Sequence, residues 1–97
     1  MAYTPENLSA LAYANGFTLW HYKTADTSGL VDTSGYFNEA ANMLRVGDFV
    51  FINASVLFES NAIPKAAGEN GVMVVVSNSN GVVDVADLTA FGSTNTD

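Results

Sequence analysis

The side chains able to do acid–base chemistry are few in this chain, and they lie far apart. His21 is its only histidine, and a general base needs a partner within hydrogen-bond reach, for which the sequence carries no signature. It has no Gly-x-Ser-x-Gly turn, no Gly-x-Gly-x-x-Gly loop and no Walker pattern. We therefore expect a protein that is not an enzyme and that uses no cofactor.

Four aspartates offer the oxygen ligands that a calcium ion prefers, provided that the fold brings them together. They are Asp26, Asp32, Asp84 and Asp87. An Asp-x-Asp-x-Asp-Gly loop is not present, and turn formation alone explains the Asp-Thr-Ser-Gly sequence that occurs at 26–29 and again at 32–35. No metal site is predicted from this pattern.

Aromatic side chains are the other candidates for ligand binding. Trp20, Tyr22, Tyr36 and Phe37 are able to stack on the rings of a glycan or to fill the core of a small domain. Core filling is favoured, because large rings in a short chain are usually needed as bulk. Glycan recognition through these rings stays open as the alternative.

Composition limits the class of partner. The chain has 97 residues, enough for one domain spanning 1–97, and its ten acidic and three basic residues give a net charge of −7. Three scattered cations do not form the footprint that nucleic acid or an anionic membrane requires. Cysteines are absent, no apolar run is long enough to cross a bilayer, and the start does not resemble a signal peptide. We expect a protein made in the cytoplasm.

Two segments have helical patterns. Thr4-Pro5-Glu6 is typical of a helix start, and Asn15-Gly16 of a helix end, so residues 1–15 are predicted to form an N-terminal helical arm. Residues 36–45 carry an apolar stripe at helical spacing, which predicts a second helix that ends at Gly47.

The remaining segments are β-prone. Strands are predicted at 17–24 and 49–58, a short extended Leu30-Val31 between two turns, and a loop at 61–71. Apolar residues on both faces of 17–24 suggest that both sides of this strand are covered. Asn80-Gly81 between 72–79 and 82–89 predicts a hairpin. Its closure places Ser77 opposite Asp84, Val76 opposite Val85 and Met73 opposite Leu88.

These elements predict a mainly β fold with one or two short helices. The expected architecture is a small antiparallel β-sandwich or barrel-like domain with a C-terminal β-hairpin. Its β-rich core would span 16–91, followed by a flexible tail at 92–97.

The segments 20–26, 31–48 and 81–85 together resemble small structural proteins of tailed bacteriophages, with an aromatic strand, a "VDTSGYFN" turn, an "LRVGD" end and a "GVVDV" strand. The resemblance covers about Gly16 to Thr89. It implies a virion component, either a head decoration or cement protein or part of a head or tail fibre, and it supplies no catalytic residues.

The combined interpretation is a protein that decorates a phage capsid by protein–protein contacts, as a homotrimer bound to the major capsid protein or another virion protein. The alternatives are a fibre or spike component that binds a host-surface glycan, and an assembly chaperone or regulator. The residues expected to contact a partner are apolar or aromatic: Leu8, Leu11, Phe17, Trp20, Tyr22, Tyr36 and Phe37.

Overall fold

The computed structural model describes residues 3–60, 63–66 and 68–92. Its main sheet has six strands in the order β1-β2-β3-β6-β7, with β8 pairing beside β7 along the same edge of β6. The strands are β1 (Leu8–Ala14), β2 (Phe17–Lys23), β3 (Phe49–Ala54), β6 (Glu69–Ser79), β7 (Val82–Val85) and β8 (Thr89–Ala90). The prediction of a mainly β domain is confirmed, although β2 and β3 are parallel, so the sheet is mixed.

The N-terminal helical arm predicted for 1–15 is wrong. Residues Pro5–Asn7 form a single 3₁₀ turn, η1, and Leu8–Ala14 then pair with β2 as the antiparallel edge strand β1. Asn15 and Gly16 have φ values of 47° and 93°, the double positive φ of a tight hairpin turn, where a helix end needs only one such residue. A two-turn helix is marginal in water, whereas a strand gains hydrogen bonds from its neighbour.

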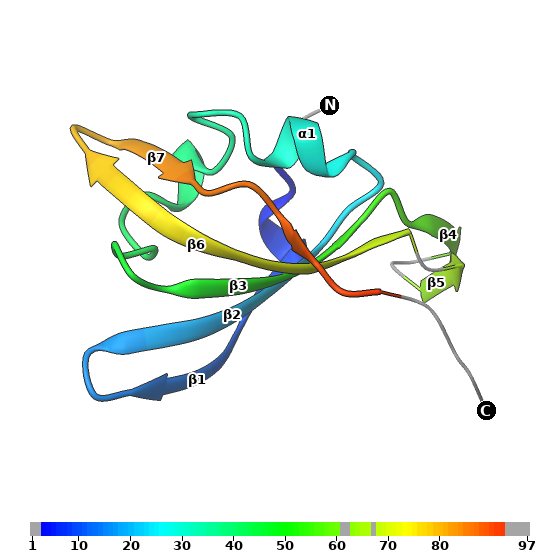
Figure 1. Cartoon of the computed structure of the whole chain (residues 1–97), viewed down its shortest axis with the longest axis horizontal. Coiled ribbons are helices and arrows are strands. Elements are labelled where there is room, and N and C mark those ends of the chain that lie inside the picture. The colour runs from blue at the N-terminus through cyan, green and yellow to red at the C-terminus, as the bar shows by residue number, and fades with distance from the viewer. Residues whose placement is uncertain (1–2, 61–62, 67, 93–97) are drawn as a thin grey trace.

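A crossover of residues 24–48 joins β2 to β3 and covers one face of the sheet (Figure 1). It contains α1 (Ser28–Val31) and the 3₁₀ turn η2 (Asn38–Ala40). The extended conformation predicted for Leu30-Val31 is wrong, because the Thr27 hydroxyl accepts from the backbone N–H of Leu30 and caps α1.

The helix predicted for 36–45 forms only as turns around η2. In an α-helix the Ala41 carbonyl would accept from the backbone N–H of Arg45. Here the Asn78 amide donates to the carbonyls of Ala41 and Leu44, while the Arg45 N–H donates to the Asp48 carboxylate. The side chains of Asn78 and Asp48 thus replace the helical bonds.

The strand predicted at 49–58 divides at Ser55, which has a φ of 54°. Residues Leu57–Ser60 form β4, which pairs with β5 (Ile63–Ala66) in a separate two-stranded ribbon. The loop predicted for 61–71 is therefore wrong for the residues that form β5 and the start of β6. Residues 61, 62 and 67 lie outside the described residues.

The C-terminal hairpin is confirmed, with Ser77 opposite Asp84. A bulge at Val76 shifts the ladder, so Val85 faces Val75 instead of the predicted Val76. The predicted register resumes at β8, where Val72 faces Thr89, but Leu88 lies between β7 and β8 and forms no ladder pair with Met73. Of the predicted tail at 92–97, only Gly92 is among the described residues.

The core lies between the sheet and the crossover. Trp20, Tyr22, Val50, Ile52, Met73 and Val75 project from the strands, and they meet Tyr3, Val31, Phe37, Ala40 and Leu44 from the segments that cover them. The opposite face of the sheet, called the outer face below, is not covered by any segment of the described residues. Within the described chain only one side of β2 is covered, so the cover predicted for its second side is not supplied by these residues.

Candidate functional site

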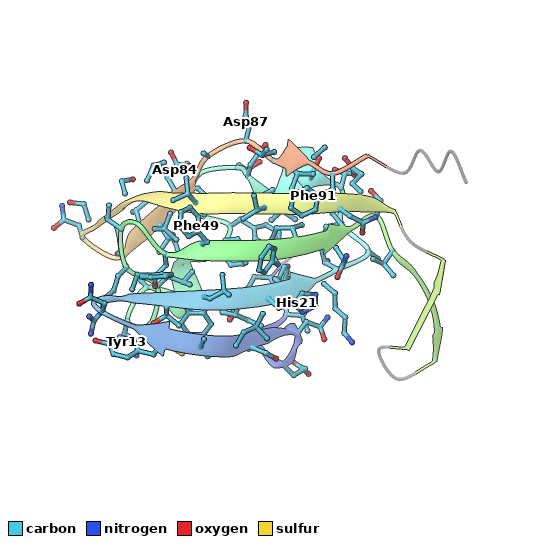
Figure 2. The ribbon with its side chains drawn as sticks, turned by 60° about the horizontal axis from the view of Figure 1, so that its bottom comes forward. Tyr13, His21, Phe49, Asp84, Asp87 and Phe91 are labelled. Carbon is cyan, nitrogen blue, oxygen red and sulfur yellow. The ribbon has the colours of Figure 1, made fainter. Side chains whose placement is uncertain are left out.

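The outer face has an apolar half and a polar end, and both follow from the register of the strands. Leu19, Phe49 and Val74 form one row across β2, β3 and β6, and His21, Phe51 and Val72 form the next. A third row is Lys23, Asn53 and Asn70. Because side chains alternate along a strand, these residues share the face opposite to the core residues. Figure 2 views the sheet from this side, with Phe49 and His21 labelled.

The apolar half of this face is partly open to solvent. Phe17 and Phe49 are 38% and 44% exposed, and their rings meet edge to face with centroids 6.2 Å apart. Leu19, Phe51, Val72 and Val74 are half-buried. Part-exposed apolar side chains gathered on one face of a sheet make this half a candidate contact surface.

The polar end is organised by a row of hydrogen bonds. His21 Nε2 lies 2.6 Å from Asn53 Oδ1, and Asn53 Nδ2 donates to Asn70 Oδ1 at 2.7 Å. The three side chains link β2, β3 and β6 across the face. Among the described residues, the side chain bonded to His21 is an amide and not the carboxylate that usually orients a catalytic histidine.

The part of this face formed by β2, β3 and β6 carries no carboxylate, and Asp84 lies at its β7 edge, opposite Ser77. None of the outward-facing residues of β2, β3 and β6, all of which are described, is acidic, and Lys23 is their only full charge at neutral pH. Asp26 and Asp48 are buried, and Glu69 faces the other side, where it accepts from Ser28 and Ser55. The other carboxylates whose side chains are described lie in η1, in the crossover and on or after β7: Glu6, Asp32, Glu39, Asp84 and Asp87.

Asp48 fixes which residues of β2 point outward. It is fully buried, and its carboxylate accepts from the backbone N–H of Thr18 and from Trp20 Nε1. It also accepts from the backbone N–H of Arg45. These bonds hold the indole on the core side, so Leu19 and His21 must face outward.

The seven predicted contact residues are divided by the structure. Tyr22 and Phe37 are 0% and 1% exposed and Trp20 is 8% exposed, so their side chains fill the core and offer a partner almost no surface. Leu8 and Tyr36 are half-buried beside them, whereas Leu11 and Phe17 are exposed. Only Phe17 belongs to the outer face.

Sequence reasoning missed most of this surface: Leu19, Phe49, Phe51, Val72 and Val74. The available signal was the uninterrupted run of apolar residues at 49–52 and 72–76. Such a run has an apolar residue on each face of the strand, and only one of those faces finds cover within the chain.

Three of the four aromatic rings considered for glycan binding, Tyr22, Tyr36 and Phe37, form an internal cluster, while Trp20 is buried beside Asp48. Tyr3 stacks on Tyr22, and Phe37 packs edge to face against both. The Thr4 N–H donates to the Tyr22 hydroxyl, which lies 2.9 Å from the Tyr36 hydroxyl, and Tyr36 donates to Asp26 at 2.7 Å. Burial, together with these hydrogen bonds, raises the pKa of Tyr36 far above its ordinary value. The cluster is a packed, hydrogen-bonded core in which the rings of Tyr22 and Phe37 are closed to a sugar by burial.

The four aspartates considered for calcium separate into two places. Asp26 is buried against Tyr36, whereas Asp32 lies near Asp84 and Asp87. Burial, followed by the charge and hydrogen bond of Asp87, raises the pKa of Asp32. Within residues 3–60, 63–66 and 68–92, no group of three or more potential ligands is arranged to hold a metal ion.

Two global findings complete the description. No helix in the described part of the chain is long and apolar enough to cross a membrane. Comparison of the chain with protein-family models, curated proteins and solved structures finds no match.

Proposed function

We propose that this chain is a structural protein that works by binding other proteins, without catalysis. The outer face is the observation that carries the proposal. It combines the half-exposed apolar residues of three neighbouring strands with the absence of carboxylates at the outward positions of those strands, in a chain whose net charge is −7. Surfaces of this composition are stable in water when another protein covers them.

The virion role within this proposal comes from the resemblance to small tailed-phage structural proteins. In that setting the chain is made in the host cytoplasm and decorates or cements a capsid, as a trimer on the major capsid protein or another virion protein. Several weak contacts from one rigid oligomer raise avidity, which suits a cement that bridges shell subunits. An acidic surface also disfavours adhesion to packaged DNA.

Glycan binding by a fibre or spike is not favoured by the geometry. Trp20 and Tyr22 are buried, and the hydroxyl of Tyr36 is bonded to Asp26 inside the aromatic cluster. Stacking requires an open ring face, which Trp20 and Tyr22 do not present.

Quantitative mass spectrometry of purified phage particles tests the proposal. A decoration protein should be present at hundreds of copies per particle, in a fixed ratio to the major capsid protein. A handful of copies would indicate a fibre or tail component. Absence from particles, with presence in infected cells, would overturn the virion role and favour an assembly chaperone or regulator.

A further inference from the structure

The outer face is an uncovered, partly apolar surface of the described chain. All of the covering segments, from η1 through α1 to η2, lie on the other side of the sheet (Figure 1). The exposed residues of this face are therefore left uncovered by every described segment of the same chain. They form a surface whose apolar half comes from β2, β3 and β6.

The charge distribution limits which class of partner can cover this face. A strongly charged partner would lose hydration against apolar side chains and would find almost no opposite charge there, because Lys23 is the only full charge on these positions at neutral pH. Nucleic acid and anionic membranes are repelled by a chain of net charge −7. The occupant must itself present an uncharged, apolar surface.

A second copy of the chain presents such a surface. The outward rows of β2, β3 and β6 carry no carboxylate, and Asp84 lies at the β7 edge of the face, opposite Ser77. Copies that meet through the three central strands therefore keep these groups apart. Contact through the crossover side or the β7 edge would instead bring Glu39, Asp84 or Asp87 of one copy against an acidic neighbour. Like charges in contact disfavour such arrangements.

We infer that further copies of this chain cover the outer face, with Phe17, Leu19, Phe49, Phe51, Val72 and Val74 at the centre of the contact. The hydrogen-bonded side chains of His21, Asn53 and Asn70 then lie at the rim, where their hydrogen bonds are already made within each copy. This arrangement has the apolar centre and polar edge of a stable interface. The number of copies, three, rests on the proposed function; the choice of surface does not.

Light scattering coupled to size exclusion, at micromolar concentration, tests the surface with matched variants. The wild type should be an oligomer, and Phe49→Asp should be a monomer, because a carboxylate would be buried without a partner. Tyr13→Asp is the control: Tyr13 is a 66% exposed aromatic residue opposite Thr18, on the other side of the sheet. This variant should keep the wild-type mass, and circular dichroism should show that both variants are folded.

A cross-linking experiment guards against a Phe49→Asp variant that fails to fold. The chain has no cysteine, so Phe49→Cys and Tyr13→Cys each introduce a single thiol. Mild oxidation should join copies of Phe49→Cys and leave Tyr13→Cys unjoined. Cross-linking of Tyr13→Cys alone would overturn the assignment and move the contact to β1.

The remaining outcomes separate this inference from the proposed function. An oligomer that persists in folded Phe49→Asp overturns the surface assignment, while high copy number in particles would still support the virion role. A monomeric wild type overturns self-association altogether. An oligomer of two copies that Phe49→Asp dissociates supports the surface and overturns the trimer.

Discussion

Trp20 Nε1 donates a hydrogen bond to Asp48 Oδ2 at 3.1 Å, between residues 28 positions apart in the chain. The same carboxylate accepts from the backbone N–H groups of Thr18 and Arg45. One buried acid thus joins the start of β2 to the end of the crossover, just before β3 begins. This junction determines the side of the sheet on which each residue of β2 lies.

Replacement of Asp48 by Ala should destabilise the fold by at least about 3 kcal/mol, because three donors, among them the buried indole N–H, lose their acceptor. Urea unfolding followed by the fluorescence of Trp20, the only tryptophan, measures the change. Asp48→Asn keeps one oxygen and should lose less. A loss below about 1 kcal/mol for Asp48→Ala would contradict the role of this junction.

Replacement of Gly81 by Val should destabilise the hairpin by about 1 kcal/mol or more, because it forces a β-branched residue to a φ of 80°. No atom lies within 4 Å of a Cβ added at Gly81 or at Gly29, and Gly29 does not have positive φ. Gly29→Ala is therefore the control, and it should leave thermal melting unchanged or slightly raised. Equal melting of Gly81→Val and wild type would show that the turn conformation is different.

Replacement of Gly71 by Ala should detach β8. A Cβ at this position would lie 2.1 Å from the Thr89 carbonyl oxygen, a backbone atom that must move. The backbone N–H of Phe91 donates to the Asn70 carbonyl beside this contact, so its hydrogen exchange should speed up in the variant. Unchanged protection of Phe91 would show that β8 does not depend on the close approach.

These examples show which features the sequence predicts and which it does not. Asn80-Gly81 predicted its hairpin because the signal is local, requiring only two positive φ values. The same dipeptide at Asn15-Gly16 was interpreted as a helix end, because the pairing of β1 with β2 competes with a weak helix and is not visible locally. The apolar stripe predicted for 36–45 is buried as expected, but the helix does not form, because the side chains of Asn78 and Asp48, outside the segment, bond to its backbone groups.

The candidate surface was hidden from sequence for a related reason. Apolar residues on both faces of a strand predict two covered sides, and only the structure reveals that the crossover covers one of them. The buried Tyr22 and Phe37 and the exposed Phe49 have similar side chains, so composition does not separate core rings from contact rings.

Replacement of Asp87 by Asn should raise the melting temperature at neutral pH. Burial, followed by the charge and hydrogen bond of Asp87, raises the pKa of Asp32 in the folded protein, so the folded state holds that proton more tightly than the unfolded state. This contribution favours folding at low pH and is lost as pH rises through the range above the ordinary aspartate pKa. The melting temperature should change less across that pH range in the variant than in the wild type. Glu6→Gln, which removes one exposed charge elsewhere, corrects for net charge.

Replacement of Glu69 by Gln should have the opposite pH signature. Hydrogen bonds from the Ser28 and Ser55 hydroxyls and from the Ser28 backbone N–H lower the pKa of Glu69. A lowered folded-state pKa gives stability that is present above the ordinary glutamate pKa and disappears as pH falls below it. Glu69→Gln should therefore melt below wild type at neutral pH, with the gap closing in acid. Glu39→Gln, at an exposed crossover position, is the charge-matched control, and a gap that stays constant with pH would contradict the link between Glu69 and α1.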